Sequence, residues 1–142
     1  MPDDFAEEEL DLDVGNALGA SEPASVQVLT LYIPDKDREG NELGTQRQWV
    51  LQAAGLLAPM GRGVTIMPPV EGGWYDEADD RTVWEHPVLV YTYIIPEPFL
   101  ERLGELREFL HRMGRETNQG EVVCEFDGQF YRITSFDPSE EA

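Results

Sequence analysis

Several stretches of the chain repeat their apolar residues at spacings typical of strands or helices. Residues 26–33 are rich in β-branched and aromatic side chains and end at a proline, which predicts a first strand. From Thr45 to Met60 the apolar positions recur at helical spacing, with Trp49, Ala53 and Leu57 lying four residues apart. This pattern predicts an amphipathic helix that ends at the glycines following Met60.

The middle of the chain predicts two more strands and a second helix. Residues 64–67 form a short apolar run closed by two prolines, and residues 88–95 are apolar enough for a central strand. After Pro96 the spacing becomes helical again, and Gly114 is the expected C-terminal cap. The apolar stripe of this helix comprises Phe99, Leu103, Leu106, Leu110 and Met113.

The chain then predicts a hairpin. Asp127-Gly128 is a strong two-residue turn signal between residues 121–126 and 129–133. Counting outwards from this turn pairs Cys124 with Tyr131 and Val122 with Ile133, on the expected core side. On the other face Arg132 lies diagonal to Glu121 and Glu125, which predicts a cross-strand charge cluster.

The order of these elements is β-α-β-β-α-β followed by one further strand. This order predicts an α+β domain of the ferredoxin-like type, with an antiparallel sheet, both helices on one face and an added C-terminal hairpin strand. We expect one domain over residues 26–136. Residues 1–25 carry eight acidic residues, no basic residue and few large apolar ones, so they predict a disordered acidic tail. Residues 137–142 form a short acidic end.

Charge narrows the function classes. The chain has 29 Asp and Glu against 10 Lys and Arg, a formal net charge of −19, and Lys36 is its one lysine. A phosphate-tracking surface needs clustered basic residues, so we expect no direct nucleic-acid binding and no binding to an anionic membrane. The N-terminus does not resemble a signal peptide, and no apolar run reaches membrane-spanning length. A single cysteine excludes an intramolecular disulfide, so a cytoplasmic location is the default expectation.

The predicted topology brings three polar loops to one end of the sheet. They are residues 34–45, 69–87 and 114–120, and the opposite end has only tight connections. Loops on a rigid scaffold often carry function, so we expect any binding site at this loop end. The candidate binding residues are Asp35, Asp37, Glu71, Trp74, Tyr75, Arg115, Asn118 and Gln119.

The first of these loops partly matches a calcium-binding loop. Asp35, Asp37 and Glu39 take ligand positions, but Gln46 replaces the carboxylate that would close the site. We therefore favour an ordinary solvated turn and keep these three carboxylates only as a weak alternative metal site. No cofactor-binding motif is found, and we expect no cofactor.

The other two loops each allow two interpretations. Trp74 and Trp84 either bind a ring or cationic group, or fold the loop back onto the sheet edge as a β-ribbon extension, which we favour. Glu85 and His86 resemble an acid–base pair, but neighbours on an extended chain point in opposite directions. Arg115 either orients an anionic group or pairs with a nearby carboxylate and joins the loops together.

The favoured function is a non-catalytic binding or regulatory protein of the antitoxin, immunity or inhibitor kind. Its expected partners are a basic protein and a second copy of itself, because Val123 and Phe130 leave the helix-free sheet face partly apolar. The first alternative is a small metal-assisted enzyme, with Asp35, Asp37 and Glu71 as ligands or base and Arg115 holding an anionic substrate. The second is an inhibitor that mimics nucleic acid. Acids and arginines alternate along the second helix, which argues against this second alternative.

Overall fold

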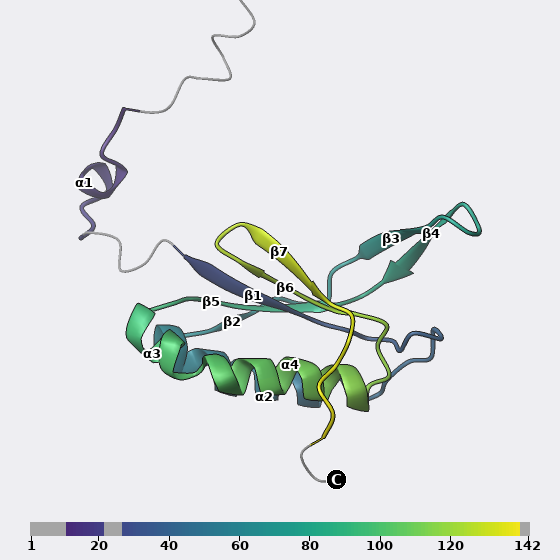
Figure 1. The fold of residues 1–142 in the computed structure, drawn as a ribbon. Coiled ribbons are helices and arrows are strands. Elements are labelled where there is room, and N and C mark those ends of the chain that lie inside the picture. The colour runs from purple at the N-terminus through teal and green to yellow at the C-terminus, as the bar shows by residue number, and fades with distance from the viewer. Residues whose placement is uncertain (1–10, 22–26, 140–142) are drawn as a thin grey trace, which may run out of the picture.

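The computed structural model describes residues 11–21 and 27–139, and its main body is an antiparallel sheet with helices on one face (Figure 1). The sheet order is β2-β5-β1-β6-β7, formed by β1 (Val28–Ile33), β2 (Thr65–Ile66), β5 (Val88–Tyr93), β6 (Val122–Phe126) and β7 (Gln129–Ile133). The strands β2, β5, β1 and β6 follow the ferredoxin-like order, and β7 extends the sheet beyond β6. The α+β ferredoxin-like fold expected from the sequence is therefore present.

The helices α2 (Gln46–Gly61), α3 (Pro96–Glu101) and α4 (Leu103–Glu116) cover one face of this sheet. The core lies between the two layers because alternate strand residues point towards the helices. Leu31 and Ile33 of β1 are fully buried there, as are Leu57 and Met60 of α2 and Met113 of α4. The other sheet face has no helix against it in the described part of the chain.

The hairpin follows the register expected from its turn. Cys124 pairs with Tyr131, and Val122 pairs with Ile133. Cys124 is buried on the core side as a free thiol, and burial raises its pKa. Tyr131 shares that side but remains 50% exposed, because β7 is an edge strand that extends past the helices.

The second helix differs from the single helix expected between Pro96 and Gly114. It breaks at Arg102 into α3 and α4, and α4 continues to Glu116. The break lets Phe99 of α3 stack on Phe126 at a centroid distance of 5.0 Å while the apolar side of α4 packs on the sheet. The expectation that Gly114 caps the helix is wrong. A Cβ atom there would lie 2.3 Å from the ring of Phe136, so this glycine permits a close approach by the C-terminal segment.

Two elements lie outside the sheet and its helices. A one-turn helix, α1 (Val14–Leu18), has no buried residue and was not expected from the sequence. The rest of the expected acidic tail, residues 1–10 and 22–25, lies outside the described residues, as does the end of the chain from residue 140. Between β2 and β5 a separate two-stranded ribbon, β3 (Gly72–Asp76) and β4 (Arg81–Glu85), extends away from the helical layer (Figure 1).

The ribbon favoured for residues 69–87 is therefore present, but its tryptophans do not fold back onto the sheet edge. Trp74 is 50% exposed and Trp84 is 60% exposed. Trp84 instead covers Gly73, the residue opposite it in the ribbon. None of the described helices is both long and apolar enough to cross a membrane.

Candidate functional site

The three polar loops meet at one end of the sheet, as the topology predicted. The backbone N–H of Arg38 donates to the carbonyl of Asn118 at 2.9 Å, which joins the first and third loops. The Gln119 amide joins the same loops by donating to the Lys36 carbonyl at 2.8 Å. The Gln46 amide donates to the His86 carbonyl at 3.0 Å and ties the second loop to the first.

Three of the nominated residues are used to hold the loop backbones, two of them between loops and Asp37 within the first loop. Asn118 and Gln119 make the contacts just described, through a carbonyl oxygen and an amide respectively. The Asp37 carboxylate accepts hydrogen bonds from the backbone N–H groups of Asn41 and Glu39, at 2.9 and 2.8 Å. These bonds, first of all the one from Asn41, lower the pKa of Asp37. We conclude that this carboxylate is already occupied by its own turn.

The weak metal alternative gains no support from the geometry. Within residues 11–21 and 27–139, no three His, Cys, Asp or Glu side chains are grouped so that they could hold a metal ion. Glu39 is exposed, and only its backbone N–H contacts Asp37. Asp35, Asp37 and Glu39 are thus parts of a turn rather than a ligand set.

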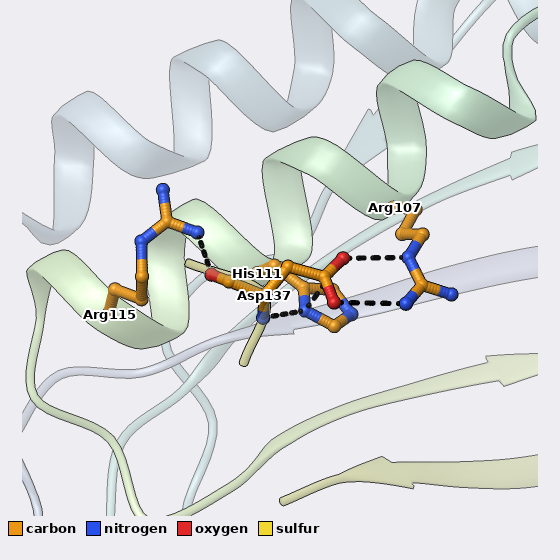
Figure 2. Close-up of polar contacts among 4 residues, drawn as sticks. All are labelled: Arg107, His111, Arg115 and Asp137. Carbon is orange, nitrogen blue, oxygen red and sulfur yellow. Dashed lines mark hydrogen bonds and ion pairs between the residues drawn. The ribbon is translucent and has the colours of Figure 1, made fainter. Parts of the chain in front are cut away.

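Arg115 lies three residues before Asn118 at the loop end, but its side chain binds the C-terminal segment. Because α4 runs on to Glu116, Arg115 is in its last turn and donates to the backbone carbonyl of Asp137 in the C-terminal segment (Figure 2). It therefore anchors that segment rather than the loops. The expected pairing of Arg115 with a loop carboxylate is not formed in the described structure.

Asp137 is the centre of this C-terminal anchor. Its carboxylate accepts two hydrogen bonds from Arg107, at 2.8 and 3.0 Å, and its backbone N–H donates to Nδ1 of the buried His111 at 2.7 Å (Figure 2). The Arg107 hydrogen bonds are the main reason that the pKa of Asp137 is lowered. The carboxylate, the backbone carbonyl and the backbone N–H of Asp137 are thus each bound to another protein group (Figure 2), so this cluster is structural.

Glu71 and Tyr75 are not part of a common cluster with the other nominated residues. Glu71 is exposed and precedes the ribbon. The Tyr75 hydroxyl donates to Asp80 at the ribbon turn, and its side chain shares a ribbon face with Trp84. Trp74 lies on the opposite ribbon face, because successive residues of a strand point to opposite sides.

Trp74 contacts Glu85, the carboxylate at the centre of the candidate site. The indole N–H of Trp74 donates to Glu85 Oε1 at 3.2 Å, across the ribbon. Glu85 is half-buried and has no ion-pair partner in the part of the chain that the structure describes. Burial is the largest influence and raises the pKa of Glu85, as do the charges of Asp35 and Glu121, whereas the Trp74 hydrogen bond and Lys36 lower it.

The surroundings of Glu85 define the rim, our name for the cluster of Asp35, Trp74, Glu85, His86 and Glu121. Asp35 Oδ2 lies 3.7 Å from His86 Nδ1. Glu121 is held by Arg132 at 2.6 Å, as the hairpin register predicted for this pair. Glu85 is therefore the carboxylate of the rim that accepts an indole hydrogen bond but forms no ion pair in the described structure.

The open sheet face, formed by the helix-free side chains of β1, β5, β6 and β7, adjoins the rim. Tyr32 of β1 donates its hydroxyl to Glu125 of β6, and its ring meets Phe130 of β7 edge-on at 6.1 Å between centroids. Burial, followed by this contact with Glu125, raises the pKa of Tyr32 to about 12. Tyr91 and Tyr93 of β5 make a second edge-on pair on the same face at 6.4 Å. This face thus offers aromatic rings beside an accepting carboxylate.

Sequence reasoning did not nominate Glu85, Glu121, Tyr32 or Glu125 as site residues. Glu85 was discussed only together with His86. A pairing of β3 with β4 around the turn at residues 77–80 places Gly72 opposite Glu85 and brings Trp74 within reach. The β-ribbon expected for residues 69–87 implied such a pairing, but no register was derived for it from the sequence.

No known protein family matches the sequence, and a search of curated proteins finds no match either. Among solved structures the fold is similar to a phage SAM lyase in complex with S-methyl-5'-thioadenosine, with a TM-score of 0.55 and 11% identity. That similarity covers 81% of this chain and 94% of the other. The apo state of a phage SAM lyase gives a TM-score of 0.52 and 12% identity, covering 84% and 97% of the two chains. At such identities the likeness concerns the fold alone.

Proposed function

We propose that this protein is a small enzyme or sensor that binds a cationic thionucleoside of the S-adenosylmethionine type at the rim. The observation that carries the proposal is Glu85, a half-buried carboxylate with a fixed indole donor and no ion-pair partner in the described structure. Burying a charge without a partner is costly, so such a group is a candidate for contact with a bound cation. A sulfonium ion beside Glu85 would supply the missing positive charge.

The composition of the site fits this ligand class better than an anionic one. Asp35 and Glu121 add negative potential around Glu85, and Lys36 offsets part of it without forming an ion pair with Glu85 in the described structure. Arg132 is already paired with Glu121. The adjoining open sheet face presents aromatic rings, which suit a flat base. A phosphorylated ligand would instead be repelled by these carboxylates.

The solved structures of similar fold support this particular class of ligand. Phage SAM lyase, whose fold this chain resembles across most of its length, has been solved with S-methyl-5'-thioadenosine bound. When the bond between the sulfonium sulfur and the amino-acid chain of S-adenosylmethionine breaks, its electron pair returns to sulfur and leaves this neutral thioether. In a cleavage by elimination, the carbon next to the one that leaves sulfur loses a proton, and a carbon–carbon double bond forms between these two carbons of the amino-acid chain. A carboxylate of raised pKa such as Glu85 is suited to accept that proton.

The test compares two ligands that differ at sulfur. Titration calorimetry with S-adenosylmethionine and with S-adenosylhomocysteine, which lacks the positive charge, isolates the contribution of the cation. We expect S-adenosylmethionine to bind at least tenfold more tightly, a difference of about 1.4 kcal/mol. Equal affinities, or no binding of either ligand, would refute the proposal.

Cleavage is measured in the same samples. Chromatography of the reaction mixture would reveal S-methyl-5'-thioadenosine if the protein is a lyase. The matched variants are Glu85→Gln, which keeps the acceptor for Trp74, and Glu77→Gln, an exposed glutamate at the ribbon turn. Only the first should weaken binding or cleavage. Binding without cleavage would assign the sensor form of the proposal.

An acidic protein-binding module is the second candidate function. It is favoured by the outer ribbon face, where Tyr75 and Trp84 are 57% and 60% exposed with no protein contact from another described element. Large aromatic side chains are enriched at the centres of protein interfaces. We propose a basic protein or a second copy of the chain as the partner, in the cytoplasm, where the free thiol of Cys124 would remain reduced. Sedimentation of the wild type and of Trp84→Thr tests self-association, and an unchanged monomer in both would exclude the second copy.

A further inference from the structure

The open sheet face contains a second carboxylate whose position is fixed by a neighbouring hydroxyl. Tyr32 donates to Oε1 of Glu125, and both side chains are partly buried on the helix-free face. A carboxylate oxygen has more than one accepting site, and its second oxygen is also free to accept. Glu125 is therefore oriented, yet retains capacity for a ligand donor.

The same place has a flat apolar surface. Phe130 is the cross-strand partner of Glu125 and is 55% exposed, with Tyr32 against its edge. Aromatic side chains with an open ring face are favourable stacking surfaces for nucleobases. An exposed ring next to a fixed acceptor can hold a base and hydrogen-bond to its edge at the same time.

The spacing relative to the rim matches one ligand lying along β6. Glu121, at the rim, and Glu125 point to the same sheet face because they are an even number of residues apart. Four residues of strand span roughly 13 Å. An extended thioadenosine can bridge most of that distance, with its sulfur near Glu85 and its base over Tyr32, Val123 and Phe130.

We propose that Glu125, positioned by Tyr32, accepts a hydrogen bond from the exocyclic amino group of adenine and so selects adenine over hypoxanthine. Adenine presents a donor at this position, whereas hypoxanthine presents a carbonyl oxygen that a carboxylate would repel. This inference rests on the proposed function, since it assigns the base end of the same ligand. Tyr32 is a positioning residue in this arrangement because its hydroxyl acts on the carboxylate and its ring forms part of the floor.

The alternative role of the Tyr32–Glu125 contact is purely structural, as a tie between β1 and β6. A structural tie would affect folding but would not distinguish two bases. The measurement that separates the two roles is therefore a ratio of affinities for two ligands rather than stability or a single affinity.

The experiment measures binding of S-methyl-5'-thioadenosine and S-methyl-5'-thioinosine to the full chain by calorimetry. We expect the wild type to prefer the adenine ligand by at least tenfold. Glu125→Gln should reduce this preference to within about threefold, because an amide can donate to a carbonyl as well as accept from an amine. Tyr32→Phe should reduce it partially, and Glu108→Gln, an exposed glutamate on α4, should leave it unchanged.

The outcomes separate this inference from the proposed function. If both ligands bind the wild type equally, or if Glu125→Gln keeps the full preference, the role of Glu125 is refuted while the rim proposal stands. If neither thionucleoside nor S-adenosylmethionine binds, the proposed function fails and this inference fails with it. Should Glu125→Gln lose its fold, seen as a collapsed thermal transition, Glu125→Asp provides the second variant. Its shorter side chain should weaken adenine binding and lower the preference, and an unchanged preference would again refute the role.

Discussion

Two carboxylates at opposite sides of this fold have opposite surroundings. Asp137 receives two hydrogen bonds from Arg107, lies beside His111 and has a lowered pKa. Glu85 is half-buried near two other carboxylates, receives one indole hydrogen bond and has a raised pKa. Charge satisfaction, rather than residue type, therefore separates a structural carboxylate from a candidate binding group.

The contrast also explains why the two regions differ in what they can bind. At the C-terminal anchor, Arg107 and Arg115 are already bound to Asp137, and Phe136 fills the space above Gly114. The rim leaves Glu85 facing a net negative environment. A cation entering the rim would relieve repulsion, whereas nothing comparable is gained at the anchor.

The largest expected effect is the loss of ligand binding when the unpaired charge is removed. Glu85→Gln should weaken S-adenosylmethionine binding about 30- to 100-fold, because a charge-assisted contact in a partly buried site contributes roughly 2–3 kcal/mol. Asp137→Asn should leave this affinity unchanged. Calorimetry on both variants checks the pair, and similar losses in the two would erase the functional distinction between the regions.

The next largest effect concerns folding stability and leaves ligand binding unchanged. Phe136→Ala should lower the free energy of unfolding by about 2 kcal/mol, because a partly buried ring over Gly114 and edge-on to His111 is lost. Ligand affinity should not change, since the anchor lies on the helical side of the sheet. Urea denaturation gives the first quantity. An affinity that falls with stability would mean that the C-terminal segment also shapes the rim.

The fold was largely predictable because its signals are local. The turn at Asp127-Gly128 fixed the register of β6 with β7, and the proline and glycine positions marked most element ends. The break at Arg102 was not predictable, since the apolar spacing runs through it without interruption. Gly114 serves the close approach of Phe136 instead of capping α4, and this contact joins residues too distant in sequence to leave a local pattern.

The candidate site was less predictable than the fold. Topology correctly placed three loops at one end, but several of the polar residues nominated there bind backbone groups of the loops, as Asp37 and Gln119 do. Loop hydrophilicity does not reveal which carboxylate lacks a partner. Identifying Glu85 required the cross-ribbon pairing, and identifying Glu125 required knowing that Tyr32 leans diagonally towards it.

A smaller effect is expected from the indole that orients Glu85. Trp74→Phe removes the N–H donor that lowers the pKa of Glu85, so this pKa should rise further. Binding of S-adenosylmethionine should weaken about threefold to tenfold because the carboxylate loses the donor that orients it. Since binding requires the ionised carboxylate, it should also be lost at a higher pH than in the wild type as the pH is lowered. Affinities measured across a pH series decide the matter, and a pH-independent loss would indicate that only the ring surface of Trp74 contributes.

The smallest effect is on thermal stability, and its sign differs between the two carboxylates. Folding disfavours ionised Glu85, so Glu85→Gln should raise the Tm by roughly 1–3 °C at neutral pH, and this gain should vanish below the pKa of glutamate in the unfolded chain. Folding favours ionised Asp137. Its stabilisation is complete above the pKa of aspartate in the unfolded chain and is lost as the pH falls through the lowered pKa of the folded state. Asp137→Asn should therefore lower the Tm at neutral pH and have little effect in strong acid.

The most direct test of the account is a titration of the Glu85 carboxyl group by carbon-detected NMR, with and without S-adenosylmethionine. We expect a pKa above that of an ordinary glutamate in the free protein, and a clear decrease when the sulfonium ligand is present but not when S-adenosylhomocysteine is present. An ordinary pKa that responds to neither ligand would contradict the claim that Glu85 is the unpaired charge on which the site depends.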